Sequence, residues 1–147
     1  MSVHGAAVGP NLSFRPMSHL RPLLESESLR MQFPICTLSV PIAQISAQLE
    51  IPFENWHELG IGEARGFGCH LPNGMMVFLD EFLSSPQPGT TVHVDASALA
   101  GRDVNDVVSA ALNGLGLSMS FVTWLQAESS WTAAQEIAKT AGAHKPS

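Results

Sequence analysis

The sequence contains no long run of apolar residues, so we expect no helix that crosses a membrane. Such a helix needs roughly 18 to 20 consecutive apolar residues, and no stretch of the 147-residue chain approaches that length. The N-terminal region has polar and proline residues where a signal peptide would have a charged start and an apolar centre. We therefore expect a soluble, cytoplasmic protein without a membrane partner, and the length favours one domain with a substantial core.

Cysteine is scarce, with Cys36 and Cys69 as the only residues of this type. Both lie in apolar, strand-like segments, which favours two buried thiols in a reducing compartment over a disulfide. None of the six histidines belongs to an H-E-x-x-H motif or a comparable ligand pattern. We expect no metal site and no cofactor.

Catalytic signatures are missing too. No G-x-S-x-G nucleophile motif occurs in the chain. The segment from Gly60 to Gly66 mimics a dinucleotide-binding fingerprint, but that motif requires a strand before it and a helix after it, and we expect the opposite order here. Asp80 and Glu81 are adjacent in an expected strand, so their carboxylates should point to opposite faces. These absences predict that the protein is not an enzyme.

Basic residues are rare in the central part of the chain. Between residues 31 and 127, Arg65 and Arg102 stand against nine carboxylates, a net charge of −7. Such a region repels phosphate backbones, which disfavours nucleic acid as a partner, and it attracts basic proteins. The same acidity is also compatible with a role in solubility alone.

The strongest structural signal is a β-hairpin from Gly66 to Phe82, with the sequence GFGCHLPNGMMVFLDEF. Its turn, Leu71 to Gly74, combines a proline that presets φ with an Asn-Gly pair that tolerates positive φ. Pairing Leu71 with Met75 places Gly68 opposite Phe78. It also creates one apolar face that must be buried under helices, formed by Phe67, Cys69, Leu71, Met75, Val77 and Leu79.

Apolar periodicity predicts the other elements. We expect an edge strand at 33–40 because it contains Pro34, and further strands at 90–96 and 121–125. Expected helices run from Pro41 to before Pro52, over 53–59, from Asp103 to a stop at Gly114 and Gly116, and over 130–143. In the last of these, one buried side is expected to consist of Trp131, Ala134, Ile137 and Ala138.

These elements predict an α+β fold: an antiparallel sheet of about four to five strands with a central hairpin, flanked by three to four helices. Residues 1–30 carry three prolines and no sustained period, so we expect them to form a flexible extension before a single domain at 31–147.

Trp56 is the most informative aromatic residue, because it lies in a polar segment between Glu54 and Glu58. A tryptophan surrounded by carboxylates has the composition of an interface hot spot for a basic partner. The alternative is that Trp56 packs under the hairpin as part of the core. The residues expected to bind a partner are Glu54, Trp56, Glu58, Glu63, Asp80 and Glu81.

Two parts of the acidic region, PFENWHELGIGEARGFGCHLPNGMMVFLDEF and VHVDASAL followed by VVSAALNGLGLSMSFVTW, lie within roughly residues 31–126. In size, acidity and order of elements, this region resembles bacterial immunity proteins of contact-dependent growth inhibition and polymorphic toxin systems. The resemblance implies a monomer or weak dimer that binds and neutralises a cognate toxin domain, which in many such systems is a basic nuclease. It transfers no individual site residues.

Two other classes stay open. Type III secretion-type effector chaperones are of similar size and acidity and form dimers, but they have two strands after the long helix where this sequence predicts one. The third class is a non-catalytic α+β structural or ligand-sensing module.

Overall fold

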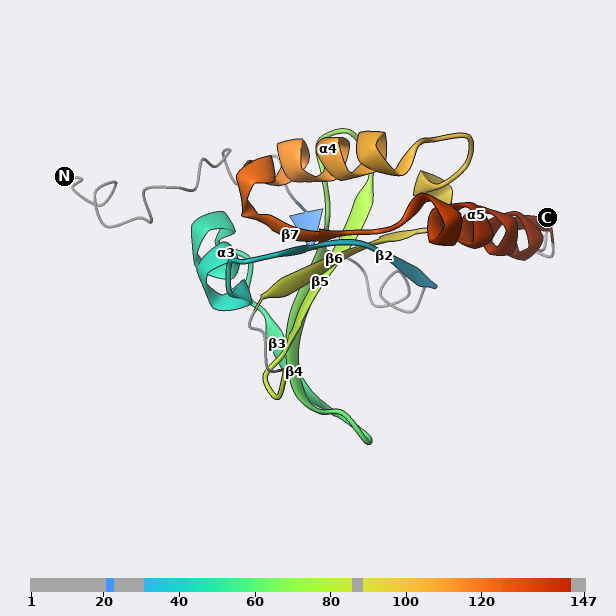
Figure 1. The fold of residues 1–147 in the computed structure, drawn as a ribbon. Coiled ribbons are helices and arrows are strands. Elements are labelled where there is room, and N and C mark those ends of the chain that lie inside the picture. Colours follow the sequence, from blue (N-terminus) through green and yellow to red (C-terminus); the bar gives the residue numbers. More distant parts are fainter. Residues whose placement is uncertain (1–20, 23–30, 86–88, 144–147) are drawn as a thin grey trace.

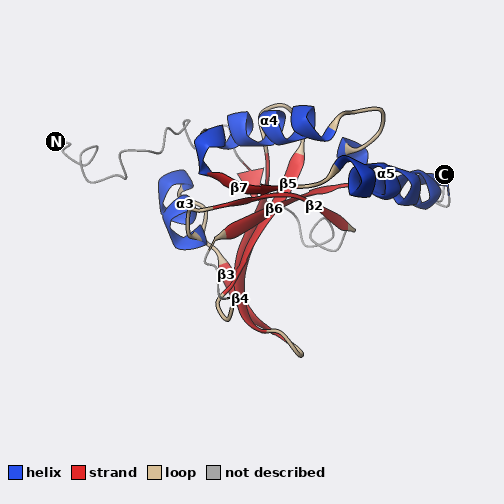
Figure 2. Ribbon diagram, in the orientation of Figure 1, coloured by secondary structure: helices blue, strands red, loops and turns tan. Residues whose placement is uncertain are grey.

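The computed structural model of the chain describes residues 21–22, 31–85 and 89–143. Most of the expected extension, residues 1–20 and 23–30, lies outside this part. The described residues form an α+β fold with one antiparallel sheet of seven strands and three α-helices (Figures 1 and 2). The α+β class and the antiparallel sheet are confirmed, while the expected number of four to five strands was too low.

The sheet has the strand order β1-β4-β5-β6-β2-β7, and β3 pairs with β4 outside this path. The strands are β1 (Arg21–Pro22), β2 (Gln32–Leu38), β3 (Glu54–Glu58), β4 (Gly62–His70), β5 (Met76–Phe82), β6 (Thr90–Asp95) and β7 (Val122–Leu125). The helices are α3 (Ile42–Leu49), α4 (Val104–Leu115) and α5 (Glu128–Ala143), and the 3₁₀ turns are η2 (Ala96–Ala98) and η3 (Met119–Phe121).

The predicted hairpin forms β4 and β5 at the centre of the sheet, with the expected register. Gly68 lies opposite Phe78, and the backbone N–H of Leu71 donates to the carbonyl oxygen of Met75 at 2.8 Å. The expected inner face is buried except at Phe67, which is only partly covered. Met76 and Phe78, on the opposite face of β5, are buried as well, so this strand is covered on both sides.

Helix α4 lies across one face of the sheet, and α3 and α5 lie near its two ends (Figure 1). The Asp103 carboxylate caps α4 by accepting from the backbone N–H of Asn105. Gly116 ends the helix in a left-handed conformation. Gly114 lies inside α4, against Leu71, where an added Cβ would be 2.7 Å from a methyl carbon. Gly114 therefore allows close packing of helix and sheet and does not end the helix.

Two secondary-structure predictions, one of a helix and one of an edge strand, were wrong because they were made from local sequence alone. Residues 53–59 are not a helix: Glu54–Glu58 form β3, which pairs with residues 62–66 of β4. Strand β2 is not at the edge, since it lies between β6 and β7. Pro34 is tolerated there because a bulge follows it and β7 pairs only with Cys36 to Leu38.

The other predicted helices and strands are largely confirmed. Trp131 and Ala138 of α5 are buried, but Ile137 is 52% exposed and does not belong to the buried side of the helix. Cys36 and Cys69 are buried and free. None of the helices among the described residues is long and apolar enough to span a membrane.

Candidate functional site

Strand β3 and the first part of β4, residues 54–66, form an arm that projects from the body of the sheet (Figure 1). The arm is a hairpin whose tip carries Leu59, Gly60 and Ile61. Leu59 is 94% exposed, and Ile61 is also exposed. Because the sequence suggested a helix here, these apolar tip residues were not recognised as candidates for binding.

Alternation along β3 places Glu54, Trp56 and Glu58 on one face of the arm. The register of the next two strands brings Asp80 of β5 to the same face, because Glu54 lies opposite Gly66 and Gly66 lies opposite Asp80. We refer to Glu54, Trp56, Glu58 and Asp80 as the Trp56 face. It joins residues from two strands that are distant in the sequence.

The indole of Trp56 lies against Gly66, which has no side chain to keep the ring away from the backbone. A Cβ built on Gly66 would lie 2.8 Å from Cη2 of the indole, so the ring covers bare backbone. The indole Nε1 donates to Oε2 of Glu58 at 2.9 Å. With 37% of its surface exposed, Trp56 is neither a core residue nor a free side chain, and it offers a positioned aromatic surface beside a carboxylate.

One carboxylate of this face, Asp80, has a perturbed pKa. Burial, and secondarily the charge of Glu58, raises the pKa of Asp80 to about 6. The neighbouring His93 lies with Nε2 3.5 Å from Oδ2 of Asp80, but burial lowers the pKa of this histidine to about 4. At neutral pH the imidazole is therefore uncharged, and it does not compensate Asp80.

His93 is a second feature that sequence analysis missed. Both ring nitrogens are buried and lack a hydrogen-bond partner among the described atoms. Alternation along β6 placed its side chain on the outer face, but alternation does not reveal that this face is covered. The imidazole therefore lies beside the Asp80 carboxylate without forming a hydrogen bond to it.

The other two expected partner-binding residues lie on the opposite face of the strands. Oε2 of Glu63 accepts a 3.0 Å hydrogen bond from Nδ1 of His57, the residue opposite it in the arm. Glu81 is only 8% exposed, and its Oε1 accepts from the backbone N–H of Ile42 at 3.2 Å, at the start of α3. Glu81 therefore satisfies a backbone N–H at a helix terminus, and Glu63 lies on the reverse side of the arm from the Trp56 face.

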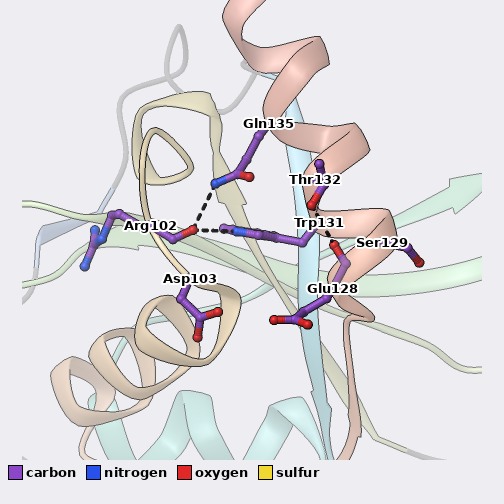
Figure 3. Close-up of a pocket in the computed structure, with 7 residues that line it drawn as sticks. All are labelled: Arg102, Asp103, Glu128, Ser129, Trp131, Thr132 and Gln135. Atoms are coloured by element: carbon purple, nitrogen blue, oxygen red, sulfur yellow. Dashed lines mark hydrogen bonds between the residues drawn. The ribbon is translucent and has the colours of Figure 1, made fainter.

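The starts of α4 and α5 border an open pocket (Figure 3). Two of its side chains connect α5 to the residue before the α4 cap: the Trp131 indole and the Gln135 amide both donate to the carbonyl oxygen of Arg102, at 2.8 and 2.9 Å. The pocket is lined by Arg102, Asp103, Glu128, Ser129, Trp131, Thr132 and Gln135. We interpret it as a packing junction, and sequence analysis did not single it out.

Within the described residues, no group of three or more histidine, cysteine, aspartate or glutamate side chains is arranged to hold a metal ion. Comparison with known proteins found no matching family, no matching curated protein and no matching solved structure. The geometry and charge of this chain are therefore the basis of the function proposed below.

Proposed function

We propose that the protein is an immunity-type inhibitor, which uses the Trp56 face to bind and neutralise a basic toxin domain. The observation that carries this proposal is the arrangement of three carboxylates around a half-exposed tryptophan on a projecting arm. The arm has one arginine or lysine, Arg65, which alternates to the opposite face and stacks on the Phe53 ring at 5.5 Å. The Trp56 face thus has no basic residue of the arm to balance it.

Electrostatics explain why such a surface favours a basic partner. Partly buried carboxylates are costly unless an opposite charge approaches them, and Asp80 already shows this cost in its raised pKa. A lysine or arginine of a partner would relieve the repulsion between Glu58 and Asp80, while the indole would supply apolar contact area. These features support binding rather than catalysis.

The class of partner comes from the resemblance to immunity proteins, in which the bound protein is a toxin domain. Type III effector chaperones are the main alternative. In the described residues, β7 is the single strand after α4, where such chaperones have two. This difference favours the inhibitor over the chaperone.

The experiment is a pull-down from the host lysate with washes of rising salt, followed by mass spectrometry and an activity assay of the retained protein. We expect one basic toxin fragment, bound one to one, whose activity the protein inhibits. The variant Glu54→Lys with Glu58→Lys should lose this partner. The matched control, Glu50→Lys with Glu136→Lys, makes the same charge change at exposed positions outside the arm and should retain it.

Three results would contradict the proposal. If a dimer retains the N-terminal segment of a secreted effector, the chaperone interpretation is correct. If folded wild-type protein retains nothing, the acidity serves solubility and the structural or ligand-sensing module becomes the leading interpretation. If the folded Glu54→Lys with Glu58→Lys variant binds as well as its control, the interface lies outside the Trp56 face.

A further inference from the structure

The outer side of β3 is an open sheet edge. Strand β3 pairs with β4, and no other strand of the described residues pairs with it. An open edge presents unpaired backbone N–H and C=O groups, which makes it a template for another strand. The question is which residues present these groups and what kind of strand they would accept.

Hydrogen bonds on the far side of β4 identify the free groups. The carbonyl oxygen of Glu63 accepts from the N–H of Leu83 at 2.9 Å, and the N–H of Leu71 donates to Met75 at 2.8 Å. The backbone N–H and C=O groups of the odd-numbered residues of β4 are therefore directed toward β5. In an antiparallel ladder, backbone groups alternate in direction, so the even-numbered residues of β4 bond to β3.

The register then assigns the edge of β3. Glu54, Trp56 and Glu58 lie opposite Gly66, Ala64 and Gly62, and their backbone groups are directed toward β4. The N–H and C=O groups of Asn55 and His57 point away from β4, at the free edge. An added antiparallel strand would bond to Asn55 and His57, and it would meet Glu54, Trp56 and Glu58 as non-hydrogen-bonded pairs, in which side chains approach most closely.

Charge distinguishes between two possible occupants of this edge. If a second copy of the chain paired antiparallel about Trp56, each Glu54 would lie directly opposite a Glu58, and like charges in that position are destabilising. A strand with lysine or arginine opposite both glutamates would instead form two cross-strand ion pairs. The edge is therefore complementary to a basic strand and not to itself.

We propose that β3 receives an added antiparallel strand from a basic partner, with lysine or arginine at positions i and i+4 and an aliphatic residue at i+2 against Trp56. This inference rests on the proposed function, because it specifies how the Trp56 face recognises its partner. Backbone hydrogen bonds to Asn55 and His57 provide affinity, and the alternating side chains provide specificity.

The test uses the full chain and the peptide acetyl-Thr-Lys-Thr-Val-Thr-Lys-Thr-amide, titrated by NMR. We expect the amide protons of Asn55 and His57 to become protected from exchange, while those of Trp56 and Glu58 change little because they already face β4. Replacing one lysine by threonine should weaken binding by up to about 5-fold, the effect of one cross-strand ion pair. A peptide with glutamate in place of both lysines should not bind.

Two backbone controls separate strand addition from simple charge attraction. N-methylation of both threonines that flank the valine blocks the amides directed at β3 and should abolish binding, whereas N-methylation of the valine should not. On the protein, Asn55→Pro removes an outward N–H at a position where an edge strand tolerates proline, and it should also abolish binding. The peptide variants keep the test valid if this substitution disturbs the arm.

The outcomes distinguish the two proposals. If the peptide binds without protecting Asn55 and His57, or if N-methylation of the flanking threonines has no effect, strand addition is refuted while the acidic binding face stands. If the glutamate peptide binds as well as the lysine peptide, charge complementarity fails, and the proposed function fails with it. If no peptide binds, strand addition to β3 is refuted, and the pull-down still decides the proposed function.

Discussion

The Asp80–His93 pair predicts a specific effect of pH on stability, and the two residues act in opposite directions. The folded-state pKa of Asp80 is about 6, against an ordinary value of 3.8. Ionised Asp80 therefore destabilises the fold above pH 6, and this cost disappears as the pH falls below 4. His93 has a folded-state pKa of about 4, against 6.5. At pH 7 His93 is neutral in both the folded and the unfolded state, so its burial does not change the free energy of unfolding. As the pH falls from 6.5 to 4, the unfolded state binds a proton at His93 that the folded state does not bind, which destabilises the fold.

The magnitudes are similar, since each pKa unit corresponds to about 1.4 kcal/mol. Each residue thus contributes about 3 kcal/mol over this range, and their side chains are only 17% and 15% exposed, so solvent screens them little. In the wild-type protein the two contributions nearly cancel between pH 7 and pH 4. A substitution that removes one contribution should therefore reveal the pH dependence that the other gives to the stability.

We expect Asp80→Asn to raise the free energy of unfolding by about 3 kcal/mol at pH 7.5 and to make stability fall steeply by pH 4.5. His93→Gln should give the reverse profile, with stability that rises as the pH falls. Urea denaturation followed by circular dichroism at several pH values measures both. Glu50→Gln, at an exposed position, is the control for loss of a surface charge.

The reasoning would be refuted if Asp80→Asn were no more stable than the wild type at pH 7.5. Profiles of both variants that ran parallel to the wild-type profile would have the same meaning. Either result would show that Asp80 and His93 are better solvated than their burial indicates.

Three further predictions concern packing and chemistry. Gly114→Ala should lower the free energy of unfolding by about 1–3 kcal/mol, since its Cβ would collide with Leu71; an increase in thermal stability from helix propensity alone would contradict this. Glu81→Ala should cost about 1–3 kcal/mol by leaving the first N–H of α3 without its acceptor, and Glu81→Gln, which keeps an oxygen there, should cost less; equal losses would show that the carboxylate charge matters instead. Burial raises the pKa of both Cys36 and Cys69 to about 12, so a thiol reagent at pH 8 should modify them only after unfolding, and rapid labelling of the native protein would disprove this.

The proposed strand addition gives the arm a physical role. Residues 54–58 have exposed or half-exposed side chains on both faces, so burial in the described structure does little to stabilise them. Their pairing with β4, and the stacking of Trp56 on Gly66, hold the arm extended. An arm that is already ordered would lose less conformational entropy when a partner binds than a disordered segment would.

Elements that depend only on neighbouring residues could be predicted from the sequence. The hairpin between β4 and β5 depends on turn residues and alternation over 17 residues, and its register was predicted correctly down to Gly68 opposite Phe78. Helix α4 has its apolar stripe and its Asp103 cap within one continuous segment. The concentration of acidic residues around Trp56 was also visible in the sequence.

The features that depend on pairing between distant segments became visible only in the three-dimensional structure. Residues 54–58 have no apolar pattern of their own and become a strand because β4 supplies hydrogen-bond partners, a context that outweighs local propensity. Alternation along β5 separates Asp80 from Glu81, and the packed sheet decides what surrounds each of them: Asp80 lies on the Trp56 face, and Glu81 is buried against the start of α3. Adjacent strand residues point to opposite faces, but only the packed sheet decides which face is covered and which one stays exposed.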